Sequence, residues 1–273
     1  MCFNPIKKTE AGGRLMNESI IVNDIRKTYT LSKKQQKIEK TKKANRRALD
    51  GLSFTAYKGE TFGLLGPNGA GKTTTLRIIA TLISMDGGSV AVNGLDVKAR
   101  ALDIRKKIGF LTSDLKLEEY FSPNYLFDFF SRLYGVDDDT RTRRKKQLFE
   151  TFGIDKYAEV KVSDLSSGMR QKVSLVIALV HDPEIIVFDE PTNGLDVIAA
   201  KVVTDYLKQL QAMGKTILLS THIFSLAERL CDRVGIIING KMVRCDTLEV
   251  LTREKKLEDL FFELYSEFTG ETL

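Results

Sequence analysis

The stretch "FGLLGPNGAGKTTTLRII" (residues 62–79) joins three patterns in order. An apolar run predicts a buried strand, a glycine-rich turn follows it, and helical periodicity begins after the turn. Inside the stretch, "GPNGAGKT" (66–73) matches the pattern G-x-x-x-x-G-K-[ST] of a phosphate-binding loop. Glycines let backbone N–H groups surround phosphate oxygens, and the N-terminal end of the following helix attracts anions. The stretch therefore predicts a site for nucleotide phosphates.

Two side chains of this loop have specific roles in the pattern. The ammonium of Lys72 is expected to reach the β- and γ-phosphates, and the hydroxyl of Thr73 is expected to bind Mg²⁺. A chance glycine turn would also match, but the strand-like run before it and the helical pattern after it favour the phosphate-binding loop. The residues expected to bind the phosphates of ATP are Gly66, Pro67, Asn68, Gly69, Ala70, Gly71, Lys72, Thr73 and Thr74.

Further along the chain, "EIIVFDEP" (184–191) is an apolar strand that ends in two carboxylates. Such carboxylates cost free energy at the end of a buried strand unless a metal or a partner uses them. Asp189 is therefore a candidate ligand of Mg²⁺. Glu190 is a candidate base that orients or deprotonates the water attacking the γ-phosphate. A surface turn is the alternative interpretation, which the phosphate-binding loop upstream makes less favourable.

Composition restricts the class of protein. The 273 residues are 42% hydrophobic and 29% charged, as in a globular protein. No apolar stretch is long enough to span a membrane, and the N-terminus lacks the apolar core of a signal peptide. The three cysteines, Cys2, Cys231 and Cys245, form no CxxC pair and leave one unpaired. This pattern favours a reducing, cytoplasmic setting.

One segment carries the net charge of +6. Residues 33–47 contain eight Lys or Arg and one Glu, a net of +7, so the rest of the chain sums to −1. The segment has no apolar periodicity, which predicts a loop, a hairpin or a frayed helix. It is either a solvated surface hairpin or a contact with an anionic membrane surface, which attracts clustered Lys and Arg. Nucleic acid is not an expected partner, because the segment lacks interleaved aromatic residues.

The order of patterns predicts an α/β fold. Strand-like and helical runs alternate after residue 165, which is typical of a mostly parallel sheet covered by helices. Before that, "GGSVAVNGLDV" (87–97) predicts a strand pair around the turn Asn93-Gly94, and helical periodicity dominates residues 114–165. One of these helices is expected to begin at Pro123, with Ser122 as its N-cap, and to stop at Gly135.

Three further motifs and one aromatic residue give the chain a family resemblance. "LSSGMRQK" (165–172), "NGLD" (193–196) and "LLSTH" ending in His222 resemble the signature, the D-loop and the switch histidine of ATP-binding cassette (ABC) proteins. Tyr29 follows the first strand-like run, where this family often stacks an aromatic ring on adenine. Order and spacing agree over about residues 20 to 240, most of the chain.

The resemblance implies a fold and a mechanism. It implies a P-loop NTPase with a mostly parallel core sheet, an antiparallel β-subdomain and a helical subdomain, using ATP and Mg²⁺. Two such subunits bind ATP head to tail and drive a separate transmembrane permease from the cytoplasmic face of the membrane. In that arrangement His222 contacts the γ-phosphate beside Glu190, and Asp196 couples the two sites. The signature residues that would contact the partner subunit's ATP are Ser166, Ser167 and Gly168.

The resemblance also implies domain limits. Residues 17–245 would form the nucleotide-binding domain, with a basic insertion at 33–47, and residues 246–273 a C-terminal helical tail. Residues 1–16 are expected to be a non-native or disordered extension, because "GGR" before Met16 is what a purine-rich ribosome-binding sequence encodes. The stretch "EEYFSPNYLFDFFSRLYG" (118–135) would form the groove that receives a helix of the permease.

Three positions depart from the family pattern. Ser113, with Asp114 next to it, stands where the family has a glutamine that touches Mg²⁺, and these two residues are the candidate replacements. Ser167 replaces a glycine of the signature, and Met169 replaces a glutamine. The "SGM[RK]Q" form of the signature and the "GFLT" loop resemble ABC exporters of the sodium-extruding, NatA-like type.

Two other functions compete with a transporter ATPase. A soluble ABC ATPase acting on ribosomes or nucleic acid usually has two cassettes or a long coiled-coil insertion, and this sequence shows neither. A P-loop kinase would have no use for the signature and the D-loop. The sequence therefore favours the ATP-hydrolysing subunit of a membrane exporter.

Overall fold

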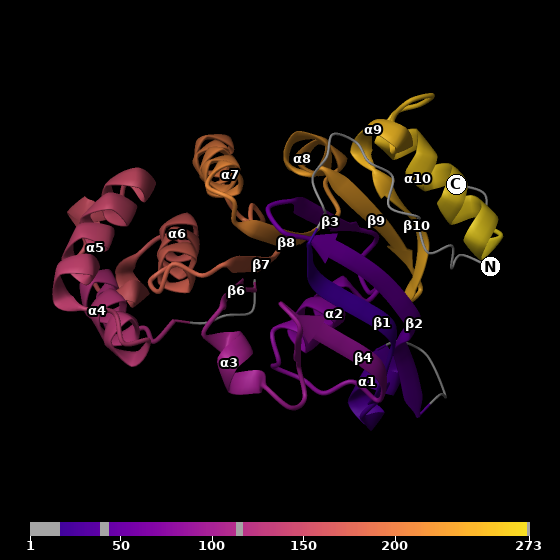
Figure 1. The fold of residues 1–273 in the computed structure, drawn as a ribbon, viewed down its shortest axis with the longest axis horizontal. Helices are drawn as coiled ribbons and strands as arrows, with labels where there is room; N and C mark the ends of the chain where they lie inside the picture. The colour runs from indigo at the N-terminus through magenta and orange to yellow at the C-terminus, as the bar shows by residue number, and fades with distance from the viewer. Residues whose placement is uncertain (1–16, 39–43, 113–116, 272–273) are drawn as a thin grey trace.

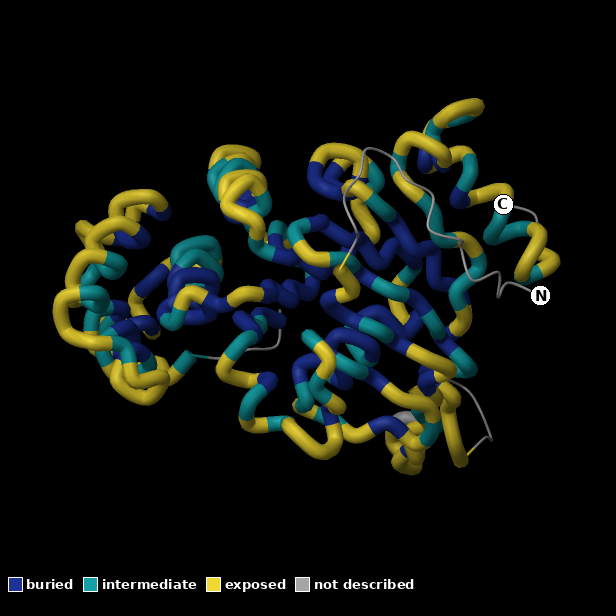
Figure 2. Tube along the Cα trace, viewed as in Figure 1, coloured by how far each residue is buried: buried dark blue, intermediate teal, exposed yellow. Residues whose placement is uncertain are grey.

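The computed structural model describes residues 17–38, 44–112 and 117–271. Two sheets lie side by side, and a group of helices extends away from the larger sheet at its β6 end (Figure 1). Buried residues concentrate between the two sheets and beneath the helices that cover the larger one (Figure 2). This is the α/β architecture with a mostly parallel sheet, an antiparallel sheet and a helical region that the sequence predicts.

The larger sheet has six strands in the order β10-β9-β3-β8-β7-β6. All neighbours run parallel except β9 and β10, which are antiparallel. The central strands read as continuous apolar runs because both faces of this sheet are covered. In chain order the strands are β3 (Thr61–Leu65), β6 (Ile108–Leu111), β7 (Ile185–Asp189), β8 (Thr216–Thr221), β9 (Arg233–Ile238) and β10 (Lys241–Thr247).

The smaller sheet is antiparallel, in the order β2-β1-β4-β5. Its tightest turn is the predicted one: Asn93 and Gly94 have φ values of 47° and 77° and join β4 to β5. Positive φ at both central residues is what a two-residue hairpin turn requires, and Asn-Gly accommodates it best. The strands are β1 (Glu18–Thr30), β2 (Asn45–Tyr57), β4 (Gly87–Val92) and β5 (Leu95–Asp96).

The described residues of the basic segment, predicted as a loop, hairpin or frayed helix, form a short helix and the start of β2. Its last three residues belong to β2, where Arg46 is paired with Tyr29 and Asn45 with Thr30 of β1. A short helix, α1 (Lys33–Ile38), follows β1, and residues 39–43 lie outside the described residues. Antiparallel pairing of residues 45–47 with β1 fits the hairpin among the predicted alternatives, and an edge strand tolerates charged side chains because pairing uses main-chain hydrogen bonds.

The helical region packs α4 and α5 against α6. The hydroxyl of Ser122 accepts a hydrogen bond from the N–H of Tyr125 at 3.3 Å, with Pro123 at the first helical position, as predicted. α2 ends at Ile79, and Thr81 follows with a φ of 61°, outside the helical region. In chain order, the helices between residues 72 and 178 are α2 (Lys72–Ile79), α3 (Ala101–Arg105), α4 (Pro123–Leu133), α5 (Asp138–Phe152) and α6 (Ser167–Ala178).

The remaining helices cover one face of the six-stranded sheet near its β8, β9 and β10 strands (Figure 1). In the C-terminal tail, Phe261 packs on Phe224 with ring centroids 5.3 Å apart, which fixes α10 to α8. Residues 246 and 247, expected in a helical tail, complete β10 instead. These helices are α7 (Val197–Ala212), α8 (Phe224–Leu230), α9 (Leu248–Leu251) and α10 (Leu257–Thr269).

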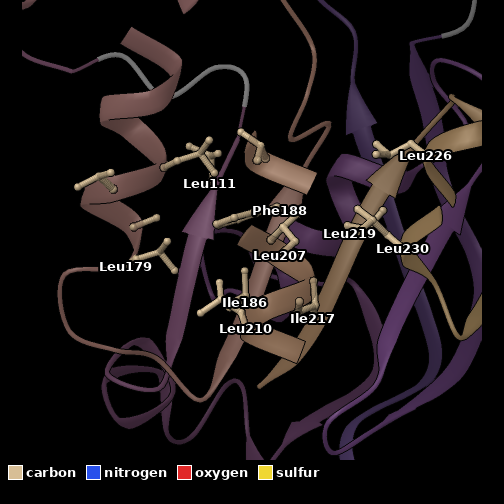
Figure 3. Packing of buried hydrophobic residues seen from close by; sticks show 14 of the residues in the cluster. Leu111, Leu179, Ile186, Phe188, Leu207, Leu210, Ile217, Leu219, Leu226 and Leu230 are labelled. Carbon is tan, nitrogen blue, oxygen red and sulfur yellow. The ribbon is translucent and has the colours of Figure 1, made fainter. Parts of the chain in front are cut away.

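Two hydrophobic cores lie on opposite faces of the six-stranded sheet. Ile186 and Phe188 of β7 belong to the core under α6, α7 and α8, whereas Ile185 and Val187 belong to the core shared with α2 and the antiparallel sheet. Figure 3 shows Phe188 among leucines from the neighbouring strands and helices. Alternate residues of one strand thus hold both layers together.

Among the described residues, no helix has both the length and the apolar character that crossing a membrane requires.

Replacing Phe188 by Ala tests this packing. The side chain has no exposed surface, and its removal leaves a cavity at the centre of the sheet. We expect the free energy of unfolding to fall by about 3–5 kcal/mol in urea titrations. Phe268→Ala is the matched control: this side chain is 41% exposed, and its loss should cost less than about 1 kcal/mol. Equal effects of the two substitutions would contradict the assignment of the core.

Candidate nucleotide-binding and catalytic site

The phosphate-binding loop connects the end of β3 to the start of α2, in the centre of the molecule (Figure 1). Gly71 is the N-cap of α2 and has a φ of 107°, which only glycine adopts readily. A Cβ on Gly66 would lie 2.3 Å from the carbonyl oxygen of Ile237, so the loop could not pack there with any larger residue. The glycines of the motif are therefore required by the backbone path, and the loop presents the N-terminal end of α2 to the pocket.

Lys72 is 5% exposed and folds back over this loop. Its ammonium donates hydrogen bonds to the carbonyl oxygens of Gly66 at 2.7 Å and Pro67 at 3.2 Å, and lies 3.7 Å from a carboxylate oxygen of Glu190. Burial lowers the pKa of Lys72, and the charges of Glu190 and Asp189 oppose that shift. Incoming phosphates would replace these carbonyl partners with oxygens of higher negative charge, which bind an ammonium more strongly.

Asp189 ends β7 and is 2% exposed. One of its carboxylate oxygens accepts hydrogen bonds from the hydroxyls of Thr73 at 2.7 Å and Thr112 at 3.5 Å, and the other accepts one from the hydroxyl of Ser220. This polar cluster consists of oxygen atoms, the ligands that Mg²⁺ prefers. No group of three or more His, Cys, Asp or Glu suited to a metal occurs in the described part of the chain. The site therefore fits a Mg²⁺ ion held by few protein oxygens and completed by phosphates and water.

Glu190 and His222 meet at the same edge of the sheet. A carboxylate oxygen of Glu190 lies 2.9 Å from Nδ1 of His222. A carboxylate oxygen only accepts hydrogen bonds, so Nδ1 is the donor in this contact. Glu190 also has a φ of 53°, in the left-handed region that non-glycine residues seldom occupy, and its N–H donates to the carbonyl oxygen of Ser220 at 3.1 Å. Strain of this kind persists where surrounding contacts hold it, commonly at functional sites.

These residues line one pocket of about 450 Å³. The structure brings together the predicted phosphate-binding, metal-binding and catalytic side chains, together with Tyr29 at the end of β1. The hydroxyl of Tyr29 lies 3.5 Å from that of Thr74. The lining residues are Tyr29, Leu31, Arg46, Ala48, Asn68, Gly69, Gly71, Lys72, Thr73, Thr74, Asp189, Glu190, Asn193 and His222.

The predicted signature lies outside this pocket. Ser166 is the N-cap of α6, and its hydroxyl accepts a hydrogen bond from the N–H of Met169 at 3.2 Å. Ser166 and Ser167 are exposed, Gly168 is half-buried, and none of the three is among the described residues that line the pocket. The start of α6 thus presents its hydroxyl and N–H groups to solvent.

The structure describes Asp196 but not Ser113 and Asp114, the candidate replacements for the family's glutamine. Asp196 is the N-cap of α7. The hydrogen bond from the backbone N–H of Ala199 is the main cause that lowers the pKa of its carboxyl group. This capping explains its place in the fold, and a role between two subunits stays a prediction. Ser113 and Asp114 lie outside the described residues, so their role also stays a prediction. Thr112, directly before them, contacts Asp189.

Sequence reasoning missed two polar residues: Arg46, which lines the pocket, and Ser220, which is buried beside Asp189. Ser220 is paired with Asp189 across β8 and β7, and its hydroxyl reaches that carboxylate. The motif "LLSTH" contains Ser220, but the sequence analysis assigned a role only to its histidine, His222. Arg46 was counted with the basic insertion, whereas the pairing of β1 with β2 puts it at the pocket.

Comparison with known proteins gives the family. The family model described as "ABC transporter" matches residues 49–193. The chain belongs to the ABC transporter family. The ABC transporter ATP-binding protein NatA of Bacillus subtilis is 39% identical over 215 residues, 78% of this chain and 87% of its own length. The Nod factor export ATP-binding protein I of Burkholderia lata is 37% identical over 241 residues, 82% of this chain and 79% of its own.

Solved structures agree with this assignment. The structure of an ATP-binding subunit of an ABC transporter is 28% identical, with a TM-score of 0.80 over 90% of this chain and 99% of its own. A bacterial ABC transporter cassette, solved as a dimer, is 25% identical, with a TM-score of 0.74 over 84% of this chain and 98% of its own. The NatA resemblance is confirmed, and the chain is an ATP-binding ABC ATPase subunit of a transporter.

Ser220→Ala tests the support of Asp189. The substitution leaves one oxygen of a buried carboxylate without its hydroxyl donor, so the free energy of unfolding should fall by about 1–3 kcal/mol. ATP hydrolysis should fall as well, because Asp189 loses its fixed orientation. Urea titration and a phosphate-release assay measure the two effects. Ser225→Ala, an exposed serine on α8, is the control. Wild-type stability in Ser220→Ala would remove this role.

Proposed function

We propose that this chain powers an ABC exporter by binding Mg-ATP between two copies of itself and hydrolysing it. The observation that supports this proposal is that the catalytic residues and the signature lie in different places on the chain. Lys72, Asp189, Glu190 and His222 converge on one pocket, whereas the signature at the start of α6 is exposed and outside it. A signature that faces solvent suits a site completed by a second copy, whose Ser166, Ser167 and Gly168 would contact the γ-phosphate. The dimeric state of the similar bacterial cassette supports this arrangement.

Hydrolysis follows from the positions of the side chains. Glu190 accepts a proton from a water whose oxygen attacks the γ-phosphorus. The bond between that phosphorus and the bridging oxygen to the β-phosphate breaks, and ADP and phosphate form. Lys72 neutralises charge on the β- and γ-phosphate oxygens, as a phosphate-binding lysine does. His222, 2.9 Å from Glu190, orients that carboxylate and contacts the γ-phosphate.

Thr73 and Asp189 would hold Mg²⁺ through the hydroxyl and carboxylate oxygens described above. When bound, the ion supplies positive charge to the β- and γ-phosphates. Tyr29, which lines the same pocket, would stack on adenine.

Glu190→Gln separates binding from hydrolysis. The amide keeps the size of the side chain but cannot accept the proton from water. We expect the hydrolysis rate to fall by about 100-fold or more, with the Kd for Mg-ATP within about threefold of wild type. Phosphate release and isothermal titration calorimetry measure the two quantities. Hydrolysis at the wild-type rate would exclude Glu190 as the base.

A groove of about 450 Å³ on the helical side is the proposed docking site for the permease. Leu82, Phe110, Phe129 and Tyr134 are among its apolar lining residues. Burial lowers the pKa of His181, which also lines the groove, to about 4, so its ring is neutral at physiological pH. An apolar groove of this kind suits an amphipathic helix. The predicted membrane contact of residues 33–47 remains a second proposed contact, at the cytoplasmic membrane surface.

The direction of transport and its substrate rest on relatives. One relative is named for Nod factor export, and the signature resembles that of sodium-extruding exporters. We therefore propose export, with Na⁺ as the first substrate to test. The permease determines selectivity, because the described pocket of this chain holds the nucleotide.

Leu82→Asp tests the docking groove. Leu82 is 52% exposed, so the charge should leave the fold intact while it weakens binding of an apolar helix. We expect affinity-purified chain from detergent-solubilised membranes to recover at least fivefold less integral membrane protein, with unchanged binding of ATP. Leu102→Asp is the matched control, since Leu102 is 72% exposed on α3 and outside the groove lining. Equal recovery with both variants, or recovery of ribosomes instead, would contradict the docking proposal.

A further inference from the structure

Arg46 is the residue of the basic segment that reaches the nucleotide pocket. It lies directly opposite Tyr29 in the β1–β2 pair, and both side chains line the pocket. The place where a Cβ of Gly69 would stand is 2.6 Å from Nη2 of Arg46. The guanidinium therefore lies beside the phosphate-binding loop at Gly69.

The position of Arg46 corresponds to a particular part of a nucleotide. Tyr29 is assigned to adenine, and Lys72, deeper in the loop, is assigned to the β- and γ-phosphates. Arg46 stands between Tyr29 and the loop at Gly69. The ribose and the α-phosphate occupy the corresponding interval of ATP. Of these two groups, a planar guanidinium with five N–H donors is suited to the phosphate.

The charges of the pocket favour the same assignment. Among its lining residues, Asp189 and Glu190 contribute −2 and Lys72 contributes +1, a formal sum of −1 before Arg46 is counted. That sum would repel a polyphosphate. Arg46 brings it to zero, and Mg²⁺ would then make the pocket attractive to the anion. Arg46 already has an interaction partner within the chain, and its five donors allow it to keep that partner or exchange it for phosphate.

We propose that Arg46 binds the α-phosphate of the nucleotide, so that the end of the basic segment is a wall of the ATP site. The proposal rests on the proposed binding of nucleotide in this pocket. It gives the segment a function at the site itself, independent of any contact between its remaining residues and a membrane.

Calorimetric titration of the full chain with Mg-ADP and Mg-GDP tests this. Arg46→Ala should raise both Kd values by about tenfold and by the same factor, because the phosphates are common to the two nucleotides. Arg46→Lys should recover part of the loss. Arg47→Ala is the matched control: Arg47 pairs with Asp50 outside the pocket, and its loss should leave both Kd values unchanged.

Three other outcomes would overturn the proposal. An unchanged Kd in Arg46→Ala excludes any contact with the nucleotide. A changed ratio of the two Kd values assigns Arg46 to the base instead of the phosphate. An equal loss in Arg47→Ala reduces the effect to general charge. Thermal melting without nucleotide confirms that each variant is folded. Lys72→Ala tests the proposed function separately. If this variant binds ADP with the wild-type Kd, the proposal that nucleotide binds in this pocket is contradicted, whatever the result for Arg46.

Discussion

Parallel pairing of β3, β8 and β7 is the constraint on which the site depends. In this order the carboxyl ends of the three strands meet at one edge of the sheet. β3 leads there into the phosphate-binding loop, β7 ends in Asp189, and β8 carries Ser220 to the same level. The buried carboxylate of Asp189 then has hydroxyl partners from Thr73, at the start of α2 after β3, and from Ser220 of the adjacent β8. Without them a buried charge would be costly, so fold stability relies on the same atoms that would hold the proposed Mg²⁺.

The same topology leaves the signature apart from the site. α6 packs directly on β6, but its N-terminal end is exposed and is not among the described residues that line the nucleotide pocket. In the proposed function, each chain would supply two complementary half-sites that lie apart from each other. Two copies arranged head to tail would complete both. In this account the energy of ATP binding is available to bring the copies together, and the groove beside α4 would pass that movement to a permease.

Local motifs predict those parts of the site that depend on a short run of residues. The loop at 66–73, the strand ending in Asp189 and Glu190, and the helix capped by Ser122 are such cases, because each contains its own strand, turn or cap signal. Ser220 and Arg46 depend instead on register between strands far apart in sequence: Asp189 is paired with Ser220, and Tyr29 with Arg46. The charge of the basic segment also hid its strand, since main-chain pairing leaves no apolar pattern at a sheet edge. Residue roles across a subunit interface, such as that of Asp196, need a second chain.

The central claim is that ATP joins two copies of this chain. Size-exclusion chromatography with light scattering on Glu190→Gln, with and without Mg-ATP, measures it directly. The account predicts a monomer without nucleotide and twice that mass with Mg-ATP, because binding is retained and hydrolysis no longer reopens the pair. A variant that binds Mg-ATP by calorimetry and remains a monomer at the same concentration would contradict the account.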